Sequence, residues 1–421
     1  MKISAIRGYK NIFLAKIMIT EIVIEYFFSF GQSTSIVLNP DTNILVGING
    51  SGKSNFMKAI QLLYEGVVGK EGIESLINKK WGGFMSFVNC ADTQVETIKI
   101  KYEFDRQIVG SVLNGKGHNF PKNPIYEIEI HKLGASNYYF SEHIYNESTN
   151  ALPHPFTYLK VNNGRGAIST KLGKNIGIQQ AIYKENELVL RQISEPDRFY
   201  PLFTLQKAIE EIVVYAYFDT TNESKIRQLS AYYSEQKLLP NGENLSHLLN
   251  YLNGNHINAY DTIISLLQNV NTQFRDLVFS QPTGSKTLLA LKEKNLERAI
   301  TVEHISDGTL RFLLLLSILY NPNRGKVICL DEPEIGLHPD MIQTIGEGIK
   351  YAAKHGTQMI VATHSPLLLN CFELEDLRIF EKNENNITSV SSKSEEDFAE
   401  WEGEFLVGQM WLRGQIGGVR W

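Results

Sequence analysis

The sequence has few of the features that mark secreted, membrane-bound or nucleic-acid-coating proteins. Its 421 residues include only three cysteines, Cys90, Cys329 and Cys371, whose wide spacing matches neither a disulfide framework nor a metal-ligand pattern. The longest apolar run, residues 312–320, is too short to span a bilayer. Charged residues interrupt the apolar N-terminal stretch, and no cleavage site typical of a signal peptide follows it. We therefore expect a cytoplasmic protein that does not enter a membrane.

Basic charge and repetitive sequence are also scarce. The net charge is -5 and no long run of Lys or Arg occurs, so tight nonspecific binding of nucleic acid through overall charge is not indicated. A local basic surface formed on dimerisation would not be visible in the composition. Internal repeats, low-complexity tracts and sustained heptads are missing, which excludes a long coiled coil.

Length and composition indicate a large α/β protein. The 421 residues exceed the usual size of one domain, and 43% hydrophobic residues are enough for a substantial core. We expect an N-terminal extension at residues 1–17 and an N-terminal lobe at 18–135. An insertion that is first β and then helical should follow at 136–285, with a C-terminal lobe at 286–421.

Periodicity predicts strands early in the chain and helices later. Residues 22–30 and 35–38 are expected to form neighbouring strands. Residues 98–104 and 126–130 alternate apolar with charged side chains, which is typical of half-buried antiparallel strands. From residue 201 to residue 273 the pattern is helical. The sequence therefore predicts a parallel core joined to an antiparallel β lobe, with a partly helical insertion.

A glycine-rich loop separates a short buried strand, residues 43–46, from an amphipathic helix. The loop, residues 47–54, reads GINGSGKS and satisfies the pattern G-x-x-x-x-G-K-[ST] in the strand, loop and helix context that it requires. Glycines let backbone N–H groups converge on phosphate oxygens at a helix N-terminus. We expect Lys53 to reach the β- and γ-phosphates of ATP and Ser54 to bind Mg²⁺. The residues predicted to bind the nucleotide are Asn49, Gly50, Ser51, Gly52, Lys53, Ser54 and Asn55.

Two acidic residues follow a second apolar run. Residues 327–330, VICL, suit a central parallel strand, and its C-terminal end carries Asp331 and Glu332. Asp331 is placed to hold the water shell of Mg²⁺, and Glu332 to orient and polarise the attacking water. A simple cap of the following helix is the alternative interpretation. The phosphate loop elsewhere in the chain favours the catalytic one.

A histidine follows a third apolar run, residues 358–363. The imidazole of His364 can hydrogen-bond a γ-phosphate oxygen or the attacking water, and can thus report whether the triphosphate is intact. A lone histidine is more often structural. Its place at a strand end downstream of Asp331 favours the functional interpretation.

Ser306 and Gly308 precede a predicted helix at residues 310–319. Ser306 is a good N-cap and Gly308 permits close approach of the backbone, so a capping role alone explains both residues. The second interpretation is that this helix N-terminus donates hydrogen bonds to a γ-phosphate bound by another copy of the chain. Its great sequence distance from the phosphate loop favours that interpretation, and with it a homodimer.

These motifs together resemble those of ABC-type, RecF/SMC-like ATPases of the AAA family. That predicted ATPase group is related to the ATPase half of overcoming-lysogenization nucleases and to antiphage defence ATPases. The resemblance covers nearly everything from Ile19 onward, and includes LPNGENLSHLLNYL, ISDGTLR, DEPEIGLHP, THSP and the terminal LVGQMWLRGQIGGVRW. It implies an α/β fold, a P-loop NTPase of the ABC-ATPase head type. A mixed sheet core, an antiparallel β lobe, a helical insertion and no long coiled coil would follow.

The implied roles follow the motifs residue by residue. The ligands of the phosphates and the metal would be Gly50, Gly52, Lys53 and Ser54. The residues that act on a partner's nucleotide would be Ser306 and Gly308. Binding of magnesium, hydrolysis and the switch function would fall to Asp331, Glu332 and His364 respectively.

Two departures from the family pattern stand out. Relatives commonly carry Asn-Phe-Arg-Ser-Phe in the first strand, whereas residues 26–30 read YFFSF here, so any nucleotide contact of that arginine is lost. The glutamine of the Q-loop has no unambiguous counterpart. A further open point is whether an aromatic-rich terminal segment packs on its own lobe or docks a partner; its members are Trp401, Phe405, Met410, Trp411 and Trp421.

The resemblance implies a Mg²⁺-dependent ATPase that forms a homodimer with composite ATP sites, with a higher oligomer left open. It would gate or sense for a separately encoded effector protein, such as a nuclease, in antiphage defence. A RecF-like ATPase that binds DNA during repair is the alternative. A ring-forming AAA+ motor would need a helical lid after His364, and a self-contained nuclease would need a C-terminal Toprim module. The residues after His364 instead predict a short hairpin, an acidic turn and a terminal helix, and we expect the chain to be too short for a Toprim module.

Overall fold

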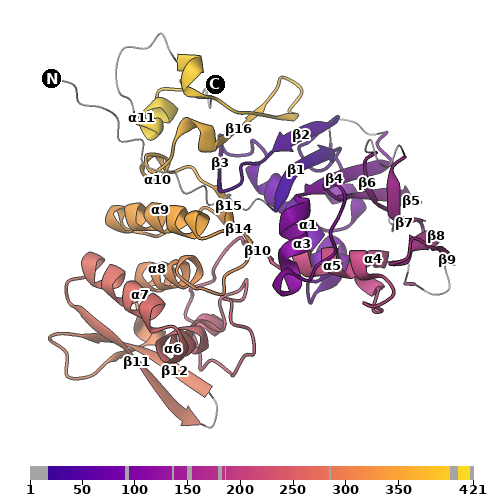
Figure 1. The fold of residues 1–421 in the computed structure, drawn as a ribbon. Coiled ribbons are helices and arrows are strands. Elements are labelled where there is room, and N and C mark those ends of the chain that lie inside the picture. The colour runs from indigo at the N-terminus through magenta and orange to yellow at the C-terminus, as the bar shows by residue number, and fades with distance from the viewer. Residues whose placement is uncertain are drawn as a thin grey trace, which may run out of the picture.

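The computed structural model describes residues 18–90, 94–134, 137–148, 154–178, 183–184, 186–283, 286–398 and 406–417. The predicted extension at 1–17 lies outside the described residues, as do Trp401, Phe405 and Trp421 of the aromatic-rich terminal segment. The described strands form three sheets of eight, six and three strands. Figure 1 shows the six-stranded sheet in the middle of the molecule, between two groups of helices.

The central sheet has the strand order β10-β14-β15-β3-β16-β17. Its first five strands are parallel, and β17 pairs antiparallel with β16. Every residue of β3 and β15 is buried, as expected for a parallel sheet covered on both faces. The strands span Ile212–Tyr215 (β10), Val327–Asp331 (β14), Gln358–Ala362 (β15), Thr42–Val46 (β3), Leu377–Lys382 (β16) and Thr388–Ser391 (β17).

Helices cover both faces of the central sheet. Helix α1 (Lys53–Val67) lies on one face, and α8 (Asp307–Leu319) and α9 (Pro339–Lys354) lie on the other (Figure 1). Alternate residues of each strand therefore enter different cores. Cys329 packs in the core that contains α1, whereas its neighbour Leu330 packs in the core that contains α8 and α9. The strand ends reach the same edge of the sheet, where α1 also begins.

An eight-stranded antiparallel sheet packs beside α1 and shares its core. The hydroxyl of the buried Tyr102 donates a 2.6 Å hydrogen bond to the carbonyl of Ala59 in α1, which fixes the helix against this sheet. The strand order is β2-β1-β4-β5-β6-β7-β8-β9. The bounds are Thr34–Val37 (β2), Ile19–Glu25 (β1), Thr97–Phe104 (β4), Ile125–Leu133 (β5), Asn137–Asn146 (β6), Phe156–Asn162 (β7), Arg165–Ser169 (β8) and Asn175–Ile178 (β9).

The first strand is shorter than predicted. It ends at Glu25 instead of continuing to residue 30, because Tyr26 and Phe28 adopt left-handed φ angles of 57° and 49° that turn the chain. The amide of Phe28 donates instead to the carbonyl of Phe87, at 2.7 Å. The aromatic side chains made these residues look like a continuous strand.

The interval from residue 201 to residue 273 is only partly helical, which corrects the prediction. Helices α5 (Tyr200–Ile209), α6 (Leu245–Asn255) and α7 (Ile257–Val270) lie within it. Strand β10 interrupts them and pairs in parallel with β14. Its four-residue apolar sequence IVVY is too short for periodicity to separate a strand from a buried helical turn.

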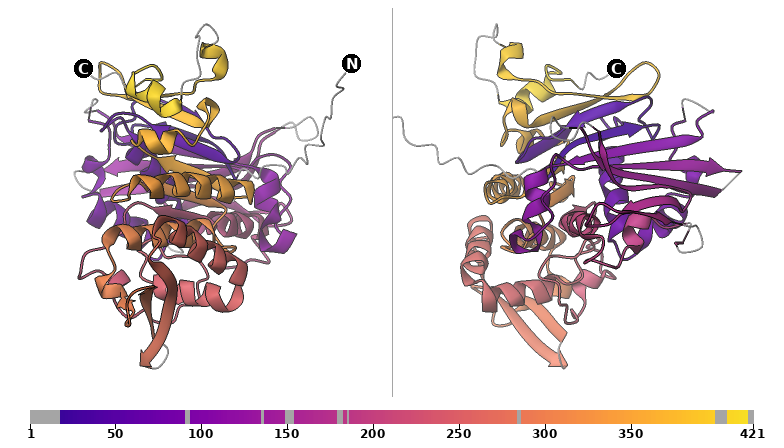
Figure 2. Two further views of the ribbon diagram at one scale, coloured as in Figure 1. Left: turned by 90° about the vertical axis from the view of Figure 1, so that its left-hand side faces the viewer. Right: turned by 45° about the vertical axis from the view of Figure 1, so that its right-hand side comes forward.

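A three-stranded sheet packs on α6 and α7 through a shared core. It contains β11 (Phe274–Thr283), β12 (Lys286–Glu293) and β13 (Ile300–Thr301). Figure 2 shows the β11–β12 hairpin protruding at the end of the molecule opposite the hairpin β16–β17. The remaining α-helices of the described residues are α2 (Gly72–Ser75), α3 (Arg106–Gly115), α4 (Val189–Gln192), α10 (Pro366–Leu369) and α11 (Val407–Leu412).

The segment predicted as an insertion, residues 136–285, contributes to all three sheets. Strands β6 to β9 continue the antiparallel sheet, β10 joins the central sheet, and β11 begins the three-stranded one. The predicted domain boundaries stay a prediction. Within the described part of the chain, no helix is both long and apolar enough to cross a membrane.

Candidate nucleotide-binding site

The loop between β3 and α1 is shaped for a phosphate. Gly50 and Gly52 have φ angles of 80° and 115°, a conformation that side chains disfavour. A Cβ atom on Gly52 would lie 2.4 Å from the hydroxyl of Thr388, and one on Gly47 would lie 2.4 Å from the carbonyl of Phe380. The first N–H groups of α1 have no helical partner, so this helix N-terminus suits an anion.

Lys53 is buried at the start of α1. Its ammonium donates hydrogen bonds to the carbonyls of Gly47 at 2.8 Å and Ile48 at 3.4 Å. A third contact, of 2.8 Å, joins Lys53 Nζ to His364 Nε2. Burial lowers the pKa of Lys53 to about 8, and nearby carboxylates, Glu332 first among them, oppose that effect. A phosphate in the loop would restore a full charge partner to this ammonium.

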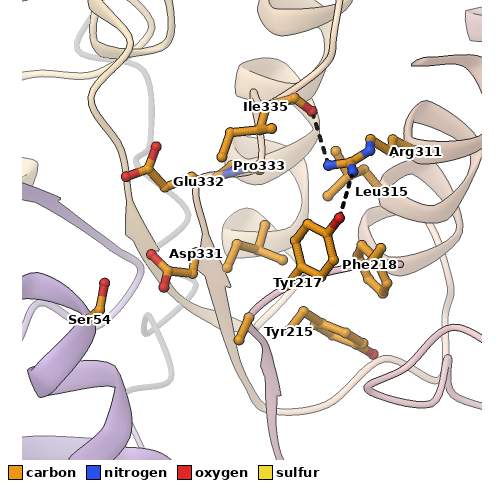
Figure 3. Close-up of a pocket in the computed structure, with 12 residues that line it drawn as sticks. Ser54, Tyr215, Tyr217, Phe218, Arg311, Leu315, Asp331, Glu332, Pro333 and Ile335 are labelled. Atoms are coloured by element: carbon orange, nitrogen blue, oxygen red, sulfur yellow. Dashed lines mark hydrogen bonds between the residues drawn. The ribbon is translucent and has the colours of Figure 1, made fainter. Parts of the chain in front are cut away.

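Asp331 ends β14 directly opposite Ser54 (Figure 3). Burial raises the pKa of Asp331, and a hydrogen bond with Ser54 opposes the rise. Its Oδ1 atom is buried without a hydrogen-bond partner among the described residues. An unsatisfied carboxylate oxygen beside a hydroxyl is a donor set that Mg²⁺ accepts together with phosphate oxygens and water. These two residues therefore fit a magnesium ion.

Glu332 is held in a strained backbone conformation with a φ angle of 50°. Its amide donates to the carbonyl of Ala362 in β15, at 2.9 Å, which places its carboxylate beside the end of that strand. Burial and the neighbouring Glu334 raise the pKa of Glu332. A carboxylate whose proton affinity is raised is suited to accept a proton from water.

His364 follows β15 and lies between Lys53 and Glu332. Its Nε2 atom is 2.8 Å from Lys53 Nζ and 3.1 Å from Glu332 Oε1. Burial and then the charge of Lys53 lower the pKa of His364 to about 4, so the ring is neutral near pH 7 and its contact with Glu332 is not an ion pair. One nitrogen cannot accept from Lys53 and donate to Glu332 at once, so the two hydrogen bonds exclude each other.

Glu334 is a site residue that sequence reasoning missed. Its Oε1 atom accepts hydrogen bonds from the Thr363 hydroxyl at 2.5 Å and from the amides of His364 and Ser365 at 3.1 Å each. The side chain thus ties the segment after β14 to the segment that carries the histidine. The third carboxylate of the DEPE sequence was the available signal.

A network of hydroxyl and amide groups supports the phosphate loop from the opposite side. Thr388 of β17, which is 1% exposed, donates a 2.7 Å hydrogen bond to the carbonyl of Ser51. Its hydroxyl also lies 2.7 Å from that of Ser29, which accepts at 2.8 Å from the amide of Asn55. Asn49 lies on the same loop, just before Gly50. The motif residues therefore depend on Ser29 and Thr388, which no motif identified.

Ser306 caps α8, as predicted. Its hydroxyl oxygen accepts from the amide of Thr309 at 3.3 Å, and Ser306 is exposed. Gly308 lies close to the loop after β14, because a Cβ atom there would be 2.9 Å from the carbonyl of Gly336. Helix α8 lies across the central sheet from α1. The structure therefore brings together Lys53, Ser54, Asp331, Glu332 and His364 but presents Ser306 separately.

A pocket of about 280 Å³ opens beside Ser54 and Asp331. Residues at the end of β10, including Tyr217, form one wall, and Arg311 of α8 forms another (Figure 3). Arg311 reaches the Tyr217 hydroxyl and the carbonyl of Ile335 at 3.5 Å each. Ser306 and Gly308 are not among the described residues that line it. The pocket wall formed by β10 was unforeseen, because that strand was not predicted.

Two known proteins are similar to this chain in sequence. The Retron Vc95 probable ATPase of Vibrio cholerae serotype O1 biovar El Tor is 24% identical over 413 residues, which is 90% of this chain and 76% of the relative. The Old nuclease of Escherichia phage P2 is 23% identical over 357 residues, covering 80% of this chain. The alignment spans only 55% of the Old nuclease.

Two solved structures of Smc heads superpose on nearly the whole chain. A head bound to the C-winged helix domain of ScpA has a TM-score of 0.56 at 13% identity, covering 91% of this chain and 100% of that one. A head with an extended coiled coil, bound to the C-terminal domain of ScpA derived from Pyrococcus furiosus, has a TM-score of 0.53 at 12% identity, covering 91% and 98%. The predicted fold, an ABC-ATPase head, is confirmed.

A family model covers residues 154–370, just over half of the chain. The matched range includes Ser306, Asp331, Glu332 and His364, while the phosphate loop precedes it. The predicted resemblance to SMC/RecF-like AAA ATPases is thereby confirmed. The chain is a P-loop ATPase and belongs to the family described as "AAA domain, putative AbiEii toxin, Type IV TA system".

Proposed function

We propose that the protein binds ATP with Mg²⁺ and hydrolyses it at composite sites shared by two copies of the chain. The observation that carries this proposal is the separation of the site into two parts. Lys53, Asp331, Glu332 and His364 converge at one edge of the sheet. Ser306 caps a different helix and is exposed. A site that needs both parts is complete only when a second copy supplies the serine.

Each converging residue has a distinct role in this proposal. Lys53 and the loop amides bind the β- and γ-phosphates, and Ser54 and Asp331 hold the metal. When bound, Mg²⁺ neutralises charge on the phosphate oxygens. Glu332 orients the attacking water and accepts its proton. His364 donates a hydrogen bond to the γ-phosphate or to that water.

The contacts among Lys53, His364 and Glu332 suggest how ATP prepares the site. The ammonium of Lys53 lies 2.8 Å from His364 Nε2. A γ-phosphate attracts that ammonium more strongly than a neutral imidazole does. His364 is then free to turn its ring toward the phosphate, and Glu332 to contact water.

The partner's contribution comes from the N-terminus of α8. The first N–H groups of a helix carry partial positive charge and lack helical partners. Gly308 has no side chain to keep a phosphate away from them. The Ser306 hydroxyl adds a donor at the same point, so α8 suits the γ-phosphate of a neighbouring copy.

The biological role that we propose is gating or sensing for a separately encoded effector, such as a nuclease, in antiphage defence. The similarity to a retron ATPase and to a phage nuclease supports this role. DNA binding in repair remains the alternative prediction. Assembly beyond a dimer and a cytoplasmic location also remain predictions.

A mixing experiment tests the composite sites. Lys53→Ala removes the phosphate ligand, and Ser306→Arg blocks the serine offered to the partner while leaving ATP binding to the monomer intact. Each variant alone should hydrolyse no ATP. In an equimolar mixture, random pairing makes half of the dimers mixed with one complete site each, so about one quarter of wild-type turnover should return. Full turnover by Ser306→Arg alone, or an inactive mixture, would refute the proposal.

A further inference from the structure

Arg227 is a buried arginine outside every motif. It lies in the short 3₁₀ turn Lys225–Arg227, between β10 and α6, and only 4% of the residue is exposed. A guanidinium keeps its charge at all ordinary pH values and carries five N–H donors. Such a group is retained in an interior only where acceptors surround it.

The acceptors of Arg227 lie on both sides of Ser306 in the sequence. Its Nη1 atom donates to the carbonyls of Val302 at 2.9 Å, Glu303 at 3.1 Å and Ile305 at 2.7 Å. Its Nη2 atom donates to the Asp307 carboxylate at 2.5 Å. The guanidinium therefore holds the chain just before Ser306 and just after it.

Ser306 itself has little else to hold it. Its hydroxyl contacts Thr309, within its own helix turn, and the residue is exposed. The direction of the first turn of α8 consequently depends on the segment that Arg227 binds. A lysine could not make the same set of hydrogen bonds, because its three donors lie on one nitrogen atom and do not form the planar fork of a guanidinium.

Arg227 has only an indirect link to the pocket of its own chain among the described residues, and this link passes through Thr220. Arg227 Nε donates to the carbonyl of Thr220 at 2.8 Å, and the Thr220 hydroxyl accepts from Arg311 at 3.3 Å. Arg311 in turn lines the pocket beside Asp331. The segment between β10 and Arg227 thus lies between the two parts of the proposed site.

We propose that Arg227 is a positioning residue, which holds the N-terminus of α8 in the orientation that lets Ser306 serve the nucleotide of a second copy. The inference rests on the proposed composite sites. It differs from a role in general stability in one respect. Loss of Arg227 should damage the partner's site and spare the nucleotide site of its own chain.

Arg227→Lys in the full chain tests the inference. The variant should bind ATP as the wild type does, yet hydrolyse it roughly 100-fold more slowly, since a small misplacement of a contacting group costs about that factor. Mixed with Lys53→Ala, it should recover turnover to the level of the Ser306→Arg and Lys53→Ala mixture. The intact serine then comes from the Lys53→Ala copy. Arg198→Lys, which changes a surface arginine paired with Glu195, is the matched control and should keep full turnover.

The outcomes separate the two proposals. If the Ser306→Arg mixture recovers turnover and the Arg227→Lys mixture does not, Arg227 acts on its own chain and the inference is wrong. If neither mixture recovers, the composite sites fail, and the inference fails with them. Wild-type turnover by Arg227→Lys alone also overturns it.

A second variant protects the test against misfolding. If Arg227→Lys loses the cooperative unfolding transition, Asp307→Asn takes its place, because that side chain is 67% exposed and its amide oxygen can still accept from the buried Arg227, although the charge is lost. It should lower turnover severalfold and be rescued by Lys53→Ala in the same way. Unchanged turnover, or a mixture that recovers no turnover, would count against a positioning role of Arg227.

Discussion

At the scale of single residues, Glu334 is expected to contribute both to the stability of the fold and to ATP hydrolysis. Its carboxylate accepts three hydrogen bonds from the segment that carries His364. Because that segment follows β15 and Glu334 follows β14, the side chain fixes the distance between the two strand ends at which the histidine and Glu332 meet.

We predict that Glu334→Ala lowers both the free energy of unfolding and kcat, with a smaller effect on ATP binding. The change leaves the amide of His364 without the acceptor that Glu334 supplies, at a cost of roughly 1–3 kcal/mol, while the amide of Ser365 keeps the Thr363 hydroxyl as an acceptor. Chemical denaturation and steady-state hydrolysis measure the two effects.

Glu334→Gln is the matched control for this prediction. Its amide oxygen can accept the same three hydrogen bonds, so it should recover most of the lost stability and turnover. If Glu334→Ala keeps wild-type kcat, the carboxylate does not position the histidine.

Motifs predicted which residues act on the phosphates, and topology explains why these residues lie together. Lys53, Asp331 and His364 follow three apolar runs, and the carboxyl ends of parallel strands meet at one edge of a sheet. Arg227 and Glu334 act through hydrogen bonds to backbone groups elsewhere in the chain. Such partners are set by tertiary packing, so no local pattern could predict them.

At the scale of elements, the hairpin β16–β17 acts as a support for the phosphate loop. Thr388 binds the carbonyl of Ser51 and approaches Ser29, and the hairpin leaves no room for a side chain at Gly47 or Gly52. The hairpin therefore holds the phosphate loop in its left-handed turns, although Thr388 is 337 residues from Ser51 in the sequence.

We predict that Thr388→Val weakens ATP binding about fivefold and leaves kcat nearly unchanged. Valine matches the shape of threonine but cannot donate to Ser51, and a lost hydrogen bond of this kind is worth about 1 kcal/mol. ATP binding to the variant must then also order a phosphate loop that is held less firmly, which lowers the affinity. Titration with a fluorescent ATP analogue gives the affinity.

Thr388→Ser keeps the hydroxyl and should bind ATP almost as the wild type does. An equal loss of affinity in both variants would point to packing of the threonine methyl group instead of the hydrogen bond. A fall in kcat without a change in affinity would also contradict a role in supporting the loop.

The predicted elements were right where apolar runs or alternation extended over several residues and wrong where they were brief. The strands β3, β14 and β15 and the antiparallel strands β4 and β5 lie where the sequence placed them. The end of β1 and the existence of β10 were missed. At Tyr26 the error was a backbone turn hidden among aromatic residues, and at β10 it was a run too short for periodicity.

At the scale of the whole molecule, the proposed reaction uses two separate surfaces of the protein. The edge with α1 carries the predicted phosphate and metal ligands, and α8, which Ser306 caps, lies on the opposite side of the central sheet (Figure 1). The sequence alone predicted both parts. The sequence could not predict that Arg227 binds the chain on either side of Ser306.

The central claim is that ATP joins two copies through Ser306. Glu332→Gln should keep ATP binding and stop turnover, and so trap the joined state. Its mass is best measured by sedimentation with and without ATP and Mg²⁺. We predict that the measured mass doubles from that of the 47.7 kDa chain only when ATP is present. The doubling should vanish in Glu332→Gln combined with Ser306→Arg. A mass that ATP does not change, or one that doubles equally without Ser306, would contradict it.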